Sequence, residues 1–164
     1  MREIKIKGKP YIIKFTHKAA KCQNCVQKVF ELVTGAMTMG NLPTDREPTL
    51  ADMISATSAQ VAMIPSLCDT MMFAGLKAEN PVATEEEAGD LLIEYMEETG
   101  KGYAEIFESF KECMEDDGFF KIAGIEDMAK NMSKAVRAET DSEEAMAEEP
   151  ETKKKSTKKT TSQK

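Results

Sequence analysis

Residues 3–16 read Glu-Ile-Lys-Ile-Lys-Gly-Lys-Pro-Tyr-Ile-Ile-Lys-Phe-Thr, and this stretch decides the fold class. Apolar and polar side chains alternate on both sides of a Gly-Lys-Pro turn, so the pattern predicts two short strands. The apolar faces of these strands carry Ile4 and Ile6, and then Tyr11, Ile13 and Phe15. A hairpin of this size is marginal alone in water. We therefore expect its apolar face to pack against helices of the same chain or against a second copy.

After Thr16 the sequence is typical of helices, loops and a tail. Apolar spacing, capping residues and Gly/Pro punctuation predict helices over about 17–34, 50–74, 84–99, 103–116 and 125–137. Thr16, Thr49 and Thr84 are predicted to cap three of these helices, and Gly35 is predicted to end the first. Pro65 is expected to kink or break the most apolar one. The predicted fold is mainly α with a small N-terminal β-hairpin (α+β), in which four to five helices form a bundle.

The chain is expected to contain one domain and a tail. Residues 138–164 hold no aromatic and no β-branched apolar side chain, whereas 1–137 can form a core. We therefore expect a hairpin-plus-helix domain over 1–137 and a disordered, charged tail over 138–164.

Charge is distributed unevenly along the chain. Residues 1–30 carry eight Lys/Arg against one acidic residue, a net charge of +7, and residues 84–127 carry fifteen Asp/Glu against three lysines, a net charge of −12. Two interpretations stay open: solvated faces that attract weakly within one monomer, or head-to-tail association of copies. The candidate residues for self-association are Lys5, Lys7, Lys14, Glu94, Glu105 and Glu108.

The helix over 50–74 is the candidate partner-binding element. Between Ala51 and Gly75 the only charged residues are Asp52 and Asp69. Met is flexible and polarisable, so Met-rich surfaces suit partners of variable sequence, although the same residues also fill gaps in ordinary cores. The candidate partner-binding residues are Met37, Met39, Met53, Met63, Met71, Met72 and Phe73.

No pattern in the sequence predicts a catalytic residue, a cofactor or a metal site. The pair Cys22-Gln-Asn-Cys25 could be a redox dithiol or half of a zinc site, but two small helical side chains are the simpler interpretation. The hairpin lysines alternate with apolar residues, as on the solvent side of a ribbon, so no nucleic-acid partner is expected. No secretion signal or membrane-length apolar run is recognised, and we expect a cytosolic protein.

One family resemblance bears on function. The hairpin residues Ile4, Ile6, Gly8, Lys9, Tyr11, Ile13, Phe15 and Thr16, together with Pro48-Thr49-Leu50 before a Met/Ile/Leu-rich helix, match a known pattern. Over about residues 1–116 the chain resembles the tail assembly chaperones of long-tailed bacteriophages and related prophage proteins.

The resemblance implies a non-enzymatic chaperone that binds the tape-measure protein, keeps it soluble and helps to recruit tail-tube subunits. It further implies a homo-oligomer that works in the cytoplasm of the bacterial host and is absent from the mature virion. The alternative is a small cytosolic regulatory or adaptor protein that binds a cellular partner through its helical surface.

Overall fold

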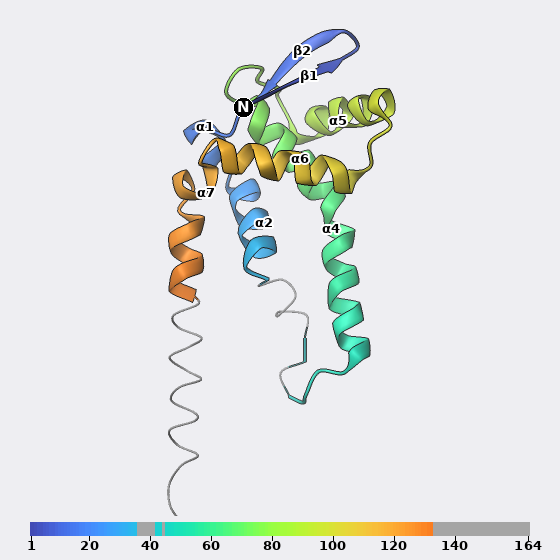
Figure 1. The fold of residues 1–164 in the computed structure, drawn as a ribbon, viewed down its shortest axis with the longest axis vertical. Helices are drawn as coiled ribbons and strands as arrows, with labels where there is room; N and C mark the ends of the chain where they lie inside the picture. Colours follow the sequence, from blue (N-terminus) through green and yellow to red (C-terminus); the bar gives the residue numbers. More distant parts are fainter. Residues whose placement is uncertain (36–41, 44, 133–164) are drawn as a thin grey trace, which may run out of the picture. The chain divides into compact units, whose positions relative to one another are not determined.

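The computed structural model of the chain describes residues 1–35, 42–43 and 45–132. This part is mostly helical and begins with a two-stranded antiparallel hairpin, which confirms the predicted fold class (Figure 1). Four of its helices have twelve residues or more. The described elements are β1 (Arg2–Ile6), β2 (Lys9–Ile13), α1 (His17–Ala20), α2 (Gln23–Thr34), α4 (Leu50–Leu76), α5 (Glu85–Thr99), α6 (Tyr103–Asp116) and α7 (Phe119–Ile122).

Met1–Ala129 form one compact unit of the chain. Residues 125–132 are helical, at the position where the sequence predicts the last helix. The predicted disordered tail, 138–164, and the predicted domain end at residue 137 lie outside the described residues.

The hairpin turns one step earlier in the chain than the sequence suggested. Lys7 and Gly8 form the turn with φ of 49° and 73°, whereas Lys9 and Pro10 already belong to β2. Two consecutive positive φ values are typical of the tight turn that matches the twist of an antiparallel pair. The register pairs Ile6 with Lys9 and Ile4 with Tyr11.

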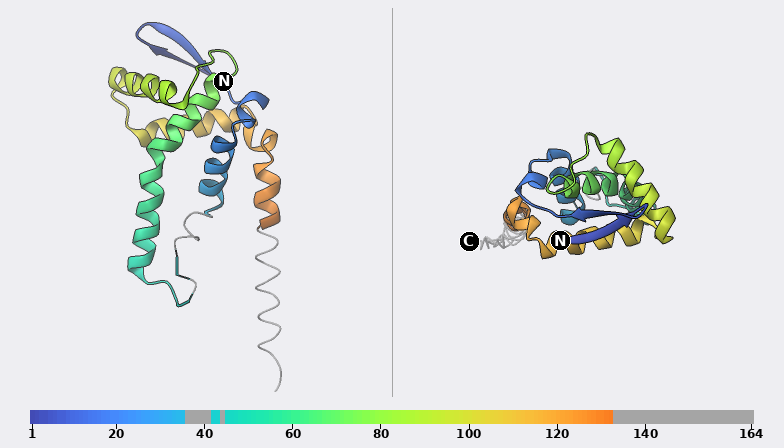
Figure 2. Two further views of the ribbon diagram at one scale, coloured as in Figure 1. Left: turned by 180° about the vertical axis from the view of Figure 1, so that it is seen from behind. Right: turned by 90° about the horizontal axis from the view of Figure 1, so that it is seen from above.

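The apolar face of the hairpin packs on helices of the same chain. β1 lies against α5 and β2 lies against α4 (Figures 1 and 2). The Lys14 N–H donates a hydrogen bond of 3.0 Å to the Gly75 carbonyl of α4. A Cβ on Gly75 would lie 2.7 Å from Ile13 Cγ2, so only glycine allows strand and helix to approach this closely. Ile4, Ile6, Ile13 and Phe15 are all buried.

The predicted helix over 17–34 is in fact two helices. Thr16 caps α1 as predicted, since its Oγ1 accepts the Lys18 N–H at 3.2 Å. The chain then leaves the helical conformation at Cys22, where ψ is 88°, and α2 follows. Because of this break, Ala19 of α1 and Cys25 of α2 can both be buried. α2 ends at Gly35 in the left-handed region, as predicted.

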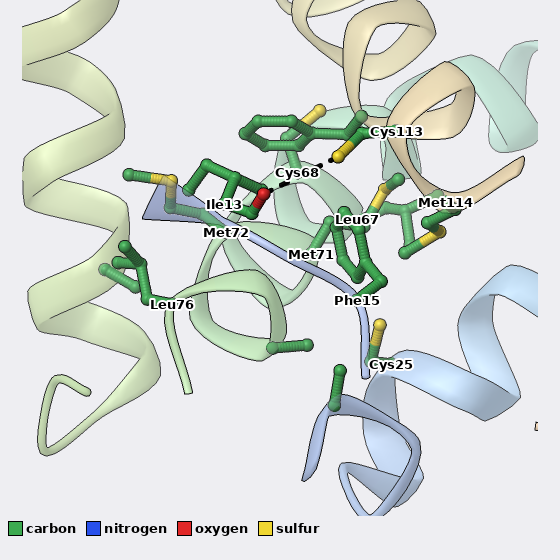
Figure 3. Close-up of a cluster of buried hydrophobic side chains, with 14 of the residues drawn as sticks. Ile13, Phe15, Cys25, Leu67, Cys68, Met71, Met72, Leu76, Cys113 and Met114 are labelled. Atoms are coloured by element: carbon green, nitrogen blue, oxygen red, sulfur yellow. Dashed lines mark hydrogen bonds between the residues drawn. The ribbon is translucent and has the colours of Figure 1, made fainter. Parts of the chain in front are cut away.

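α4 is continuous through Pro65 and is the centre of the fold. Proline cannot donate to the carbonyl four residues earlier, and the ribbon of α4 bends along its length (Figure 1). The C-terminal part of α4 contributes to a core shared with β2, α2 and α6 (Figure 3). Within this core Cys113 Sγ donates to the Ile13 carbonyl at 3.7 Å.

The acidic helices begin much as the sequence predicts. Thr84 Oγ1 accepts the Glu87 N–H at 3.1 Å, but the Glu87 carboxylate accepts the Ala83 N–H at 2.8 Å rather than that of Thr84. α6 spans its predicted residues. Its apolar stripe, Ile106, Phe110, Cys113 and Met114, is buried.

Candidate partner-binding surface

α4 has two parts with opposite environments. Residues 65–76 include side chains that are more than nine tenths buried, such as those of Leu67, Cys68 and Met72. Residues 50–64 keep large apolar side chains in solvent: Leu50 is 74 % exposed and Val61 is 58 % exposed. A soluble protein rarely leaves such side chains grouped together unless something binds there.

The exposed part of α4 forms an apolar, hollowed face. The hollow has a volume of about 530 Å³. None of the α4 side chains that line it is charged. We call this surface the exposed α4 face; it consists of Leu50 together with the lining residues Met53, Ile54, Thr57, Ser58, Val61 and Ala62.

The two hydroxyls of this face are directed into the helix itself. Thr57 Oγ1 donates to the Met53 carbonyl at 2.9 Å, and Ser58 Oγ donates to the Ile54 carbonyl at 2.8 Å. A side-chain donor that is bonded to the preceding turn no longer needs solvent or a partner. The face therefore presents almost only carbon to whatever binds it.

A charged network fixes the start of this exposed segment. The Arg46 guanidinium donates to both carboxylate oxygens of Asp52, at 2.7 and 2.9 Å. Asp52 also accepts the Thr49 N–H at 2.8 Å, and Thr49 Oγ1 accepts the Asp52 N–H at 3.3 Å. These hydrogen bonds, that from Arg46 foremost, lower the pKa of Asp52 well below its usual range. The segment is thus held helical before a partner arrives, which reduces the entropy lost on binding.

The predicted partner-binding residues divide between this face and the core. Met53 lies on the exposed α4 face, and Met63 is half-buried. Met71 and Met72 were predicted wrongly as binding residues: they are 1 % and 0 % exposed and contact the core side chains drawn in Figure 3. Phe73 is half-buried, with Lys77 Nζ 4.5 Å above its ring. Met37 and Met39 lie outside the described residues.

Several of the predicted self-association charges already have partners in the same chain. Lys7 Nζ pairs with Glu94, and the Lys7 N–H donates to Glu98 Oε1 at 2.7 Å. Lys14 Nζ lies 3.9 Å from Glu79. The basic hairpin and acidic α5 therefore do meet within one monomer.

The α6 candidates are also engaged locally, and one hairpin lysine is not. Glu105 Oε2 accepts the Gly102 N–H at 3.0 Å, and Glu108 lies 3.5 Å from Lys111 one turn away. Lys5 is exposed, and no ion pair to another described residue is found for it.

The cysteines are free thiols in buried positions. Burial raises the pKa of Cys25 to about 12, and burial likewise raises that of Cys68 to about 12. A nucleophilic dithiol requires a thiolate at neutral pH, so the environment of Cys25 disfavours redox chemistry. Within residues 1–35, 42–43 and 45–132, no group of three or more His, Cys, Asp or Glu side chains could hold a metal ion.

The length and composition of α4 also satisfy the criteria for a membrane span. Its most apolar window has a mean hydropathy of 1.2, and 44 % of that window is buried inside the protein. No run of this length was expected from the sequence, because serines, threonines and alanines separate the large apolar residues of α4. The core helix of a soluble protein can have the same length and composition, so these two properties alone do not identify α4 as a span.

Comparison with known proteins gives no match to any protein-family model, curated protein or solved structure.

Sequence reasoning missed part of the exposed α4 face. The predicted partner-binding residues did not include Leu50, Ile54, Thr57, Ser58, Val61 or Ala62. One signal was available. Residues 55–60 read Ser-Ala-Thr-Ser-Ala-Gln, six consecutive residues without a large apolar side chain, which is too little bulk for a continuous core contact.

Proposed function

We propose that this protein is a tail assembly chaperone of a long-tailed phage or prophage, which holds the tape-measure protein in a soluble state through the exposed α4 face. One observation carries the proposal: an apolar, uncharged helical surface remains in solvent after the other described residues have formed their core. The resemblance of the hairpin and of the 48–50 segment to such chaperones supplies the identity of the client.

The chemistry of the face suits a client of this kind. A tape-measure protein is a long, partly apolar helix that would aggregate before the tail tube encloses it. The face includes Ile54, Thr57, Ser58 and Val61, which follow the i, i+3, i+4 and i+7 spacing through which helices pack against each other. Contact without charges tolerates many client sequences, and many copies can cover one client.

In the same proposal the chaperone acts in the host cytoplasm and assists the recruitment of tail-tube subunits. It leaves the client when the tube closes, so it is absent from the finished virion. Copies are proposed to act together as a homo-oligomer along the client.

Co-expression with the tape-measure protein of the same gene cluster tests the role. We expect wild-type chain to move the client into the soluble fraction. Ile54→Glu and Val61→Glu place charges on the exposed α4 face and should abolish this rescue. Ile93→Glu is the matched control, because Ile93 is a 45 % exposed apolar residue on α5, away from the face.

Two results would count against the proposal. Absence of rescue by a folded wild-type chain would exclude the chaperone role and favour the adaptor alternative. Equal rescue by Val61→Glu and wild type would remove the exposed α4 face from the mechanism.

A further inference from the structure

The outer edge of β1 is a free strand edge. Because Ile6 pairs with Lys9 and Ile4 pairs with Tyr11 across a two-residue turn, these even-numbered residues direct their N–H and C=O groups toward β2. The groups of Glu3 and Lys5 therefore point away from β2. Among the described residues, neither backbone has a hydrogen-bond partner, and both side chains are exposed.

Every other outward N–H along the two edges is absent or already bonded. The Lys7 N–H, next along β1, donates to Glu98. On β2, Pro10 has no N–H, the Ile12 N–H donates to Asn80 Oδ1 at 2.8 Å, and the Lys14 N–H donates to the Gly75 carbonyl. Proteins usually cover or interrupt free strand edges because such edges pair with other strands. Here β2 offers no free outward N–H, whereas Glu3 and Lys5 of β1 keep theirs.

The geometry points to a symmetric dimer in which β1 pairs antiparallel with β1 of a second copy, centred on Ile4. In this register Glu3 lies opposite Lys5 of the second copy, and Lys5 lies opposite its Glu3. Each opposed pair can exchange two backbone hydrogen bonds. These bonds use all the free N–H and C=O groups of Glu3 and Lys5 in both copies, and the two hairpins become one four-stranded sheet.

Charge selects this register over its neighbours. A shift of two residues in one direction would place Glu3 opposite Glu3, and a shift in the other would place Lys5 opposite Lys5. Opposite charges facing each other across strands stabilise the pairing, and like charges destabilise it. The charges of β1 are therefore complementary to those of β1 in a second copy. Both copies use the same surface, so the interface is isologous.

This dimer differs from the head-to-tail association considered from the sequence, since Lys7 and Glu94 are paired within the monomer. It is also independent of the proposed client, because it uses the hairpin and not the exposed α4 face. An edge of two outward-facing residues is small beside a standard interface, so the expected dissociation constant lies between roughly 0.1 and 1 mM.

Sedimentation velocity of the full chain from about 10 µM to about 1 mM tests the pairing. Wild type should show a concentration-dependent dimer. Lys5→Glu places four carboxylates together and should weaken the dimer at least about tenfold. The double variant Glu3→Lys/Lys5→Glu exchanges the two charges, keeps the net charge, and should restore the dimer.

Two further measurements address the backbone. Lys5→Pro removes an outward N–H without removing a bond to β2, so it should weaken the dimer while circular dichroism stays unchanged. Hydrogen exchange of the Glu3 and Lys5 amides should slow as concentration rises, whereas that of Lys7 should not. A wild type that stays monomeric at 1 mM, or a double variant no better than Lys5→Glu, would overturn the inference.

Discussion

The two parts of α4 have a similar share of large apolar residues but opposite environments. Residues 65–76 contribute to the hydrophobic core, whereas Leu50, Ile54 and Val61 of the earlier part are each more than half exposed. Burying one such side chain contributes about 1.5–3 kcal/mol. Apolarity alone therefore does not tell which part of a helix stabilises the monomer. The supply of packing partners decides it, and a part left without them is available to another chain.

Truncating one methionine in each part of α4 tests this difference most strongly. Met72→Ala removes a fully buried side chain and should lower the free energy of unfolding by about 2–5 kcal/mol, because it loses transfer energy and leaves a cavity. Met53→Ala removes a half-exposed side chain and should change it by at most about 0.5 kcal/mol. Urea denaturation followed by circular dichroism measures both. Equal losses would show that residues 50–64 also belong to the folding core.

A smaller effect is expected where β2 meets the buried part of α4. Gly75→Ala puts a Cβ 2.7 Å from Ile13 Cγ2 and should cost about 1–3 kcal/mol, since strand or helix must shift. Ser58→Ala is the control in the exposed part, where alanine is the better helix former and little change is expected. Denaturant midpoints compare the two variants. A Gly75→Ala protein as stable as wild type would mean that the hairpin docks less tightly than the contact indicates.

Much of the fold could be predicted because its signals are local. The hairpin alternation, the caps at Thr16, Thr49 and Thr84, and the stripe of α6 each depend on residues within one or two turns of one another. Such local signals can be recognised in the sequence without knowing the tertiary structure. The position of the hairpin turn was wrong by a residue because Gly8 was assigned to its start rather than to its second position.

Features that depend on tertiary packing could not be predicted. The break at Cys22 places Ala19 and Cys25 in one core, and no local breaker marks it. Met71 and Met72 are no different in type from Met53, so composition could not separate core residues from surface residues. The Lys7–Glu94 pair joins residues far apart in sequence, and only the docking of β1 on α5 brings them together.

The cap of the exposed part tests whether that part is held by local interactions. Thr49→Ala removes the hydroxyl that accepts the Asp52 N–H, and an N-cap loss of this kind costs about 1 kcal/mol. Since tertiary contacts are few there, the loss should appear as faster hydrogen exchange over residues 50–56 and not over 67–76. Uniform acceleration along all of α4 would contradict this expectation.

The smallest effect concerns the acid dependence of the same cap. Hydrogen bonds from Arg46 and Thr49 lower the pKa of Asp52 below its ordinary value. The stability that the ionised Asp52 carboxylate gives to the cap is therefore complete above the ordinary pKa, and it is lost as the pH falls through the lowered pKa. Hydrogen exchange of the first turn of α4 in wild type should therefore become faster, relative to its intrinsic rate, as the pH falls from about 4 to about 2. Asp52→Asn has no carboxylate to protonate at this position, so it should lack the part of the acceleration that comes from Asp52. The other carboxylates are common to both proteins, so their effect cancels in the comparison. Identical acid profiles for the two chains would show that the network around Asp52 does not hold the exposed part of α4 in place.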